Sequence, residues 1–245
     1  MKSKRRLDLL LVERGLAPTR EKAQALILAG LVEVDGRPGA KAGASYDEMV
    51  EIAVAGPPHP YVSRGGVKLA AALDHFGLDP AGLVCLDVGA STGGFTDCLL
   101  QRGAARVYAV DVGHGQLDAR LRSDPRVVVR EKVNARALSA AEVPERVDLV
   151  VADVSFISLR LILPAVAALA KSGAAIVTLV KPQFEAGRGE VPRGGVVKSE
   201  EVRQRVVGEI EEAGRSLGLA VLGSVRSPIQ GARGNEEFLL GFRVN

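Results

Sequence analysis

Residues 80–245 contain short apolar runs that alternate with stretches in which apolar residues recur every three or four positions. The apolar runs span residues 83–87, 106–111, 126–129, 147–153 and 174–181. They are nearly continuous rather than alternately polar, which is typical of strands buried on both faces of a sheet. The alternation of strands and helices therefore predicts an α/β domain with a largely parallel sheet and helices on both faces.

Helices and further strands are predicted around these runs. The helices are expected at 95–100, 159–170 and 200–217, and the last strands at 220–224 and 237–243. Arg160 and Pro164 interrupt the most apolar of the helices, which we interpret as a buried helix rather than a membrane span. Pro228 and two glycines separate the last strands, which can form a hairpin at the edge of the sheet.

The N-terminal residues have a different pattern, with two short helices and a hairpin. The helices are predicted at 6–15 and 19–30, and the strands at 32–34 and 49–52. Gly15 and Gly30 are typical helix ends, and Thr19 is a typical N-cap. Asp35 and Gly36 predict the hairpin turn. These elements are enough for a small α+β module.

A proline-rich stretch separates the two patterns. Pro57, Pro58 and Pro60 favour an extended, semi-rigid connector. We therefore predict a small domain over residues 1–54, a connector over 55–62 and an α/β domain over 63–245.

The composition is that of a globular protein, with 47% hydrophobic and 25% charged residues among 245. No apolar run approaches the ~20 residues of a membrane-spanning helix, and the N-terminus lacks the apolar core of a signal peptide. The two cysteines, Cys85 and Cys98, fall in a predicted strand and a predicted helix. We interpret them as small core residues of a protein from a reducing compartment. We therefore expect a cytoplasmic protein.

Positive charge is concentrated at the N-terminus. Residues 1–25 contain seven Lys and Arg against three Asp and Glu, whereas the whole chain has a formal net charge of only +3. A basic end on a nearly neutral body indicates contacts with phosphate groups. A solvated basic face is the alternative, and charge alone does not distinguish the two.

The N-terminal module resembles the alpha-L RNA-binding motif found in a small-subunit ribosomal protein, tyrosyl-tRNA synthetases and pseudouridine synthases. The matching positions are Arg6-Leu7-Asp8, Leu11, Gly15, Thr19-Arg20, Ala23, Leu26-Ile27, Gly30, Val32, Val34, Gly36 and Lys41. In that motif the second helix and the following turn lie against structured RNA. The resemblance implies that Arg6, Arg20, Lys22 and Lys41 contact RNA phosphates.

The turn after the first strand of the α/β domain contains Asp87, Gly89, Gly93 and Gly94. Its glycines let the backbone turn sharply and let a ligand approach the following helix. Asp111 ends the next strand, where a carboxylate can reach both hydroxyls of a ribose. The turn lacks G-x-G-x-x-G spacing, and an acid before its first glycine would repel a pyrophosphate. An adenosine ligand with a cationic end, such as S-adenosylmethionine, fits better.

Asp153 and Lys181 end the fourth and fifth apolar runs. Open α/β sheets place their chemistry at the carboxyl ends of parallel strands, where these two residues are expected. A lysine directly after a buried strand is rarely required by structure alone, although a surface ion pair with Asp153 is an alternative. Lys68 and Glu237 are ordinary charged residues when each is considered alone.

Taken together, these segments resemble the TlyA family of ribosomal RNA 2′-O-ribose methyltransferases, also called haemolysins, whose catalytic domain is FtsJ-like. The resemblance extends over essentially the whole chain and rests on residues 63–68, 87–95, 153–156, 181–185 and 234–237. It implies a Rossmann-like, S-adenosylmethionine-dependent methyltransferase sheet. The catalytic Lys-Asp-Lys-Glu set of the family falls on Lys68, Asp153, Lys181 and Glu237, since the Gly-Asn-x-Glu spacing selects Glu237 over Glu236.

The resemblance also implies the ligands. The predicted cofactor-binding residues are Asp87, Gly89, Ser91, Gly93, Gly94, Asp111 and Asp153, and Arg64 joins the predicted RNA contacts. Ribosomal RNA or ribosomal subunits are the expected partner, and a cytidine ribose is the expected acceptor. No metal, membrane or obligate protein partner is expected.

A ribose 2′-hydroxyl is a poor nucleophile, so the enzyme must align it with the methyl group and ease the loss of its proton. We hypothesise that Lys181 orients or deprotonates the hydroxyl, with Lys68 as a neighbouring cation. Asp153 and Glu237 would fix the ammonium groups and the ribose. The glycine-rich stretch 188–198 is interpreted either as a flap over RNA or as an ordinary solvated loop.

Three other classes of function remain as alternatives. A non-catalytic RNA- or ribosome-binding factor would not need the four catalytic residues. A nicotinamide-dependent oxidoreductase is disfavoured by the spacing of the glycine turn. A membrane-active haemolysin would need a spanning or strongly amphipathic lipid-facing segment, and none is apparent in the sequence.

Overall fold

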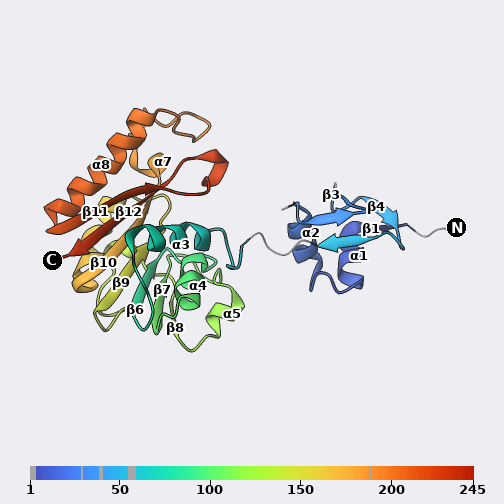
Figure 1. Cartoon of the computed structure of the whole chain (residues 1–245), viewed down its shortest axis with the longest axis horizontal. Coiled ribbons are helices and arrows are strands. Elements are labelled where there is room, and N and C mark those ends of the chain that lie inside the picture. The colour runs from blue at the N-terminus through green and yellow to red at the C-terminus, as the bar shows by residue number, and fades with distance from the viewer. Residues whose placement is uncertain (1–3, 29, 39–40, 55–58, 188) are drawn as a thin grey trace. The chain divides into compact units, whose positions relative to one another are not determined.

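A computed structural model describes residues 4–28, 30–38, 41–54, 59–187 and 189–245. The chain divides into two compact units, residues 1–60 and 61–245 (Figure 1). Of the predicted connector, residues 55–58 lie outside the described part of the chain. Tyr61 and Val62, also assigned to the connector, fall within the second unit, where the backbone N–H of Val62 donates to Asp97.

The first unit packs two helices against short strands. Its elements are β1 (Lys4–Arg6), α1 (Leu7–Glu13), α2 (Arg20–Leu28), β2 (Val32–Val34), β3 (Arg37–Pro38), β4 (Ser45–Asp47) and β5 (Ile52–Val54). Strand β2 lies between β3 and β5, and β1 pairs with β4. The core of this unit is apolar, and its fully buried members include Leu7, Leu11, Ala23 and Val32.

Two boundaries in the first unit differ from the prediction. Arg6 was expected in the first helix but ends β1, because it pairs with Ser45 of β4. The return strand was expected at 49–52 but begins at Ile52, which pairs with Val34. Met49 lies in a turn and is almost fully exposed, so the apolar character of that residue was misleading.

The second unit is built on a seven-stranded sheet with the order β11-β12-β10-β9-β6-β7-β8 (Figure 1). The strands are β6 (Val84–Val88), β7 (Arg106–Val110), β8 (Val127–Arg130), β9 (Val147–Ala152), β10 (Ala170–Val180), β11 (Leu219–Arg226) and β12 (Phe238–Val244). Strands β6 to β10 are parallel, and β12 is antiparallel to both β10 and β11. The predicted α/β fold is confirmed. The last two strands form the predicted hairpin. Strand β11 is the edge strand, and β12 lies between β11 and β10.

Helices cover both faces of this sheet. They are α3 (Gly65–Phe76), α4 (Gly94–Gln101), α5 (Ala119–Arg122), α6 (Leu163–Leu169), α7 (Pro182–Glu185) and α8 (Glu200–Ser216), with short 3₁₀ helices η1 (Ala135–Ala137), η2 (Leu159–Leu161) and η3 (Ala232–Gly234). Adjacent strand residues belong to opposite cores. Leu86 packs with residues of α6 and α8, whereas Cys85 packs with residues of α3 and α4. The continuous apolar runs arise from this burial on both faces.

The predicted helix over 159–170 is divided between a 3₁₀ turn, η2, and α6. Pro164 lies in the first turn of α6, where a missing N–H leaves no hydrogen bond unmade. Ala170 already belongs to β10, so this strand starts earlier than the predicted 174. Helix α3 was not assigned from the sequence, and it carries Lys68.

Candidate active site

The site lies at the carboxyl edge of the parallel strands, where the loops after β6, β7, β9 and β10 meet. Strand order reverses at β6. Its neighbour on one side is β7, the next strand in the chain, and its neighbour on the other side is β9. Open α/β sheets bind ligands at such a switch point. The predicted Asp87, Asp111, Asp153 and Lys181 all fall at this edge.

The glycines of the first turn make room for protein atoms. Gly89 has a φ of +85°, and a Cβ atom there would collide with the carbonyl oxygen of Asp153. At Gly93, with a φ of +100°, a Cβ atom would collide with Leu121, and at Gly94 it would collide with Ser63. These contacts fix the turn against its neighbours. Close packing therefore accounts for the glycines, and their predicted contact with a cofactor stays a prediction.

Asp87 is fully buried near the end of β6. Thr96 of α4 donates a hydrogen bond of 2.6 Å to one carboxylate oxygen, and the other oxygen has no hydrogen-bond partner among the described residues. Burial raises the pKa of Asp87 to about 7, and the nearby Asp153 adds to the rise. Asp87 does not itself line the cavities described below.

Asp111 directly follows β7 and is held by the backbone. The N–H groups of Ser91 and Gly113 donate to its two carboxylate oxygens at 2.8 and 2.7 Å. Each oxygen retains a further lone pair, so the carboxylate can still accept from the two hydroxyls of a ribose. The bond from Ser91 also couples the predicted ribose site to the glycine turn.

Two adjoining cavities open at this edge, with volumes of about 290 and 520 Å³. Gly89, Ser91, Asp153 and Ser155 line both of them. The smaller cavity also contains Arg64, Lys68, Phe95 and Lys181. The larger one also contains Asp111, Val112, Asn134, Phe156 and Ile157. One cavity is therefore rich in lysine and the other combines apolar walls with the Asp111 carboxylate.

Lys181 follows β10 and reaches back to the loop after β9. Its Nζ lies 2.6 Å from a carboxylate oxygen of Asp153 and donates to Ser155 Oγ at 2.9 Å. Only 11% of the Lys181 side chain is exposed. Pro182 excludes a helical backbone at Lys181, which keeps the extended conformation of the strand and precedes α7. Sequence and backbone together place the ammonium group in the smaller cavity.

Lys68 forms the second ion pair of the site, with Glu237. Lys68 Nζ lies 2.5 Å from Glu237, and both side chains are almost completely buried. The neighbouring Glu236 faces Arg203 and Arg226 instead, at 2.9 and 3.0 Å. Glu237 rather than Glu236 therefore pairs with Lys68, and its catalytic role stays a prediction. Glu237 lies behind Lys68 and does not line the cavity.

The four predicted catalytic residues thus form two separate lysine–carboxylate pairs, and both lysines face one cavity. Ser155 and Phe156 received no role from the sequence, although both lie in the segment 153–156 that carries the family resemblance. Phe156 is 90% exposed, has a φ of +63° and packs on Phe184 with ring centroids 4.8 Å apart. An exposed phenylalanine in the left-handed region is a costly arrangement that indicates a function.

The predicted RNA-binding residues fall into two groups. Arg6 and Arg20 both bind the fully buried Asp8, and Arg6 contacts both of its oxygens. Gln24 also donates to Asp8, and these bonds, Arg6 foremost, hold the pKa of the carboxyl well below its usual range. The side chains of Arg6 and Arg20 remain 43% and 49% exposed, so both can still reach a phosphate.

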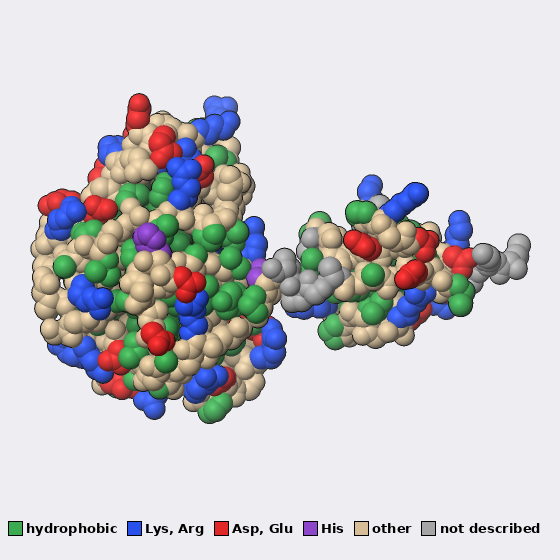
Figure 2. All heavy atoms as spheres, viewed as in Figure 1, with side chains coloured by type: hydrophobic (Ala, Val, Ile, Leu, Met, Phe, Trp, Pro, Cys, Tyr) green, Lys and Arg blue, Asp and Glu red, His purple; other side chains and the backbone are tan. Residues whose placement is uncertain are grey.

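Lys22, Lys41 and Arg64 are exposed and have no ion-pair partner within the described ranges. Arg64 lies at the start of α3 and lines the smaller cavity. On the face drawn in Figure 2, Lys and Arg side chains of the second unit are interspersed with Asp and Glu. In the second unit, Arg64 at the smaller cavity is therefore a better candidate for a phosphate contact than the mixed charges of the drawn face.

The stretch 188–198, interpreted as a flap or a solvated loop, is attached at two points in its described part. Glu190 accepts from Gly187 N–H and pairs with Arg205 of α8. The buried Asn235 accepts from Val197 N–H and donates to the carbonyl oxygen of Gly195. Residue 188 lies outside the described part of the chain.

Two broader features bear on the alternatives. Among the described residues, no group of three or more His, Cys, Asp or Glu is arranged to hold a metal ion. In the same part of the chain, no helix is both long enough and apolar enough to span a bilayer.

Comparisons with known proteins agree on both units. The model of the FtsJ-like methyltransferase family matches residues 61–244, and that of the S4 domain matches residues 5–48. The 16S/23S rRNA (cytidine-2′-O)-methyltransferase TlyA of Mycobacterium tuberculosis is 50% identical over 100% of this chain and 91% of its own length. Hemolysin A of Brachyspira hyodysenteriae is 41% identical over 98% of this chain and all of its own length.

A solved structure of a hemolysin-named protein from Streptococcus thermophilus has a TM-score of 0.78 and 42% identity, covering 100% of this chain and 90% of its own. The predicted fold, the predicted enzyme class and the predicted family are all confirmed by these matches. With an N-terminal S4 domain and a catalytic domain of the FtsJ-like type, the chain belongs to the TlyA family of methyltransferases.

Proposed function

We propose that this protein transfers the methyl group of S-adenosylmethionine to the ribose 2′-hydroxyl of a cytidine in ribosomal RNA. The observation that carries the proposal is the pairing of Lys181 with Asp153 at the junction of the two cavities. The specificity for cytidine and for ribosomal RNA is taken from the mycobacterial relative, a 16S/23S rRNA (cytidine-2′-O)-methyltransferase. We assign ribosomal subunits as the form of this substrate and the cytoplasm as the location of the reaction, on the ground of the ribosomal RNA acceptor of that relative.

The larger cavity fits the adenosine part of this cofactor. Asp111 has free acceptor capacity for two ribose hydroxyls, and Val112 and Ile157 supply apolar walls for a base. Buried Asp87 has one oxygen without a donor, and a buried carboxylate of this kind favours a cationic ligand nearby. When bound, S-adenosylmethionine supplies an activated methyl group, so the remaining task of the protein is to present the acceptor.

Lys181 and Asp153 present that acceptor. Both line the smaller cavity next to the wall that it shares with the larger one. A hydroxyl bound at the Lys181 ammonium lies within reach of the Asp153 carboxylate, so the pair can orient the hydroxyl and remove its proton. The role proposed for Lys181 is therefore either to orient the hydroxyl or to deprotonate it.

Lys68 adds a second cation to the cavity wall. Glu237 holds the Lys68 side chain from behind, so its ammonium group is fixed before the substrate arrives. A fixed cation here stabilises negative charge that develops on the ribose oxygen. We therefore assign electrostatic stabilisation to Lys68 and positioning to Glu237.

Phe156 supplies a surface for the base of the target nucleotide. Its ring is exposed at the rim of the larger cavity and is supported from behind by Phe184. Proteins that act on single nucleotides commonly stack the displaced base on an aromatic side chain. A base that rests on Phe156 would bring its ribose toward Lys181. Binding of flanking RNA is assigned to Arg64 and to Arg6, Arg20, Lys22 and Lys41 of the S4 domain.

The direct test is methylation of ribosomal subunits taken from cells that lack the protein. Purified protein and S-adenosylmethionine are added, and 2′-O-methyl groups are mapped along both ribosomal RNAs by resistance to alkaline cleavage. The proposal expects a new 2′-O-methylcytidine at one or a few defined positions. A methyl group on a base, or on no nucleotide of either subunit, would refute it.

A further inference from the structure

Glu185 is a buried carboxylate that takes no part in the proposed mechanism. It ends α7, is only 7% exposed and lies outside both cavities. Within the described ranges, no Lys or Arg forms an ion pair with it, although Arg160 is close enough to act on it electrostatically. A buried carboxylate without an ion pair is costly unless hydrogen bonds compensate for the lost water.

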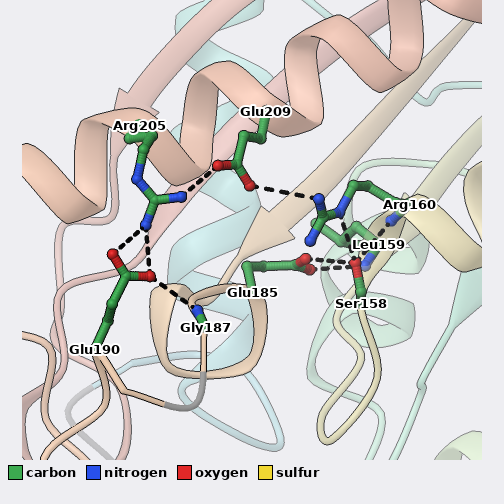
Figure 3. A network of polar contacts seen from close by, with 8 residues as sticks. All are labelled: Ser158, Leu159, Arg160, Glu185, Gly187, Glu190, Arg205 and Glu209. Carbon is green, nitrogen blue, oxygen red and sulfur yellow. Dashed lines mark hydrogen bonds and ion pairs between the residues drawn. The ribbon is translucent and has the colours of Figure 1, made fainter.

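Two short hydrogen bonds provide that compensation. Ser158 Oγ donates to one carboxylate oxygen at 2.5 Å, and the backbone N–H of Leu159 donates to the other at 2.7 Å. Figure 3 shows the carboxylate pointing from the turn of α7 toward the start of η2. Both acceptor atoms of Glu185 are therefore used to join two segments that are 27 residues apart.

These two segments carry the reactive side chains. The loop from β9 to Ser158 contains Asp153, Ser155 and Phe156, and the one-turn helix α7 follows directly after Lys181. We propose that Glu185 is a positioning residue for methyl transfer, whose carboxylate fixes the Lys181 segment to the Asp153 loop. This inference rests on the proposed function of the site. It adds a residue that touches neither the cofactor nor the acceptor.

Helix α7 is too short to stay in place without this connection. A single helical turn has little stability of its own, so it holds Lys181 in place only if its far end is attached. The ion pair of Lys181 with Asp153 joins the loops at one end, and Glu185 joins them at the other. Two attachments fix an orientation that one leaves free. Errors of about 1 Å in such geometry cost about a hundredfold in rate.

Helix α8 supports the Ser158 side of the connection (Figure 3). Arg160 donates from its backbone N–H and Nε to Ser158 Oγ and also reaches Glu209 of α8. Glu209 in turn pairs with Arg205, which pairs with Glu190. The side chains of these outer ion pairs are 34–45% exposed, and pairs this open to water contribute little to stability. Glu209 therefore provides a matched control, as a carboxylate of the same network in an exposed place.

The test compares Glu185→Ala, Glu185→Gln and Glu209→Ala in the full-length protein. We expect Glu185→Ala to lower kcat about 10- to 100-fold while the Kd for S-adenosylmethionine stays within about twofold. Glu185→Gln keeps an acceptor for Leu159 N–H and should restore at least part of the lost kcat. Glu209→Ala should stay within about twofold of the wild type. A purely structural role would instead lower the Tm and leave kcat per folded molecule unchanged.

Amide hydrogen exchange gives a readout that does not depend on activity. Exchange over 153–158 and 181–186 should quicken in Glu185→Ala and stay at the wild-type rate in Glu209→Ala. If Glu185→Ala does not fold, Ser158→Ala removes one of the two bonds and should show the same pattern more weakly. Wild-type kcat or unchanged exchange in a folded Glu185→Ala or Ser158→Ala protein would overturn the inference. Inactivity of the wild type toward RNA would refute only the proposed function.

Discussion

Asp8 in the S4 domain and Asp87 in the methyltransferase domain are both fully buried carboxylates, yet their surroundings are opposite. Asp8 accepts from Arg6, Arg20 and Gln24, and these bonds keep its pKa well below the usual range. Among the described residues, Asp87 accepts from Thr96 alone and retains one oxygen without a donor, and burial raises its pKa to about 7. The cations near Asp8 come from the chain itself.

Asp8 and Asp87 differ as a carboxylate with a structural role differs from one that can interact with a ligand. A carboxylate whose partners are all present stabilises its own domain, and its arginines offer only their outer edges to RNA. A carboxylate that is buried without sufficient partners lowers stability and favours the binding of a cationic group. We therefore predict that the first domain needs no ligand to satisfy Asp8, whereas a cationic ligand stabilises the second domain.

The sharpest consequence concerns Lys181. We expect Lys181→Ala to lower methyl transfer about 1000-fold, because it removes the group that orients or deprotonates the acceptor, while cofactor affinity stays within about threefold. Lys171→Ala is the matched control, since Lys171 also pairs with an aspartate, Asp148, at 2.6 Å but lies outside both cavities. Transfer is measured with a radioactive methyl donor and affinity by calorimetry. Substantial residual transfer in Lys181→Ala would contradict the assigned role.

Asp87→Asn should weaken S-adenosylmethionine binding about ten- to hundredfold, because it removes a buried negative charge beneath the turn whose Gly89 lines both cavities. Asp8→Asn should leave cofactor affinity within about twofold. In the wild type, the affinity should also fall as the pH decreases below 7, because Asp87 then takes up a proton, and this dependence should vanish in Asp87→Asn. Calorimetric titrations at pH 6, 7 and 8 provide the measurement. Equal affinities in the wild type and Asp87→Asn would break the comparison.

The two domains should also respond in opposite ways to pH in the absence of ligand. Folded Asp87 binds a proton more tightly than the unfolded chain, so it should make the second domain more stable as the pH falls from 7 toward about 4. Asp8 binds a proton less tightly when folded, so its stabilisation is lost only as the pH falls below about 4. Hydrogen exchange resolved by domain, in the wild type and in each Asn variant, measures both. A parallel response would count against the contrast.

The smallest expected effect belongs to the exposed lysines of the S4 domain. Lys22→Ala and Lys41→Ala should each weaken RNA binding severalfold and reduce the dependence of log Kd on log salt by about one unit, as for a lost phosphate contact. Neither should change the Tm, because neither lysine has an ion-pair partner in the described part of the chain. Arg6→Ala should change both the affinity and the Tm, because Arg6 also binds Asp8. Filter binding at several salt concentrations distinguishes these cases.

The sequence predicts most of the fold because the parallel strands are buried on both faces and appear as apolar runs. Asp153 and Lys181 could be placed at the carboxyl edge for the same reason, since each directly follows such a run. The assignment of Lys68 and Glu237 depended on the family resemblance, because neither is exceptional among its neighbours. Their pairing across the chain agrees with it.

What escaped prediction depends on contacts between distant residues. Glu185 stood inside a recognised segment, but its bonds to Ser158 and Leu159 exist only after two loops meet. Phe156 lies in a quoted segment but received no role from the sequence, and only the structure shows its left-handed backbone, its exposed ring and its contact with Phe184. Arg6 was placed in a helix because local propensity does not show pairing with β4.

The insertion of β12 between β10 and β11 has a consequence for the order of assembly. Glu237 directly precedes this strand and lies 169 residues from its partner Lys68, while every other strand of the sheet is synthesised earlier. Contacts so distant along the chain form late in folding. A nascent chain can thus possess the cofactor turn and Lys181 yet lack a fixed Lys68. The proposed site would then be completed only once β12 has been synthesised.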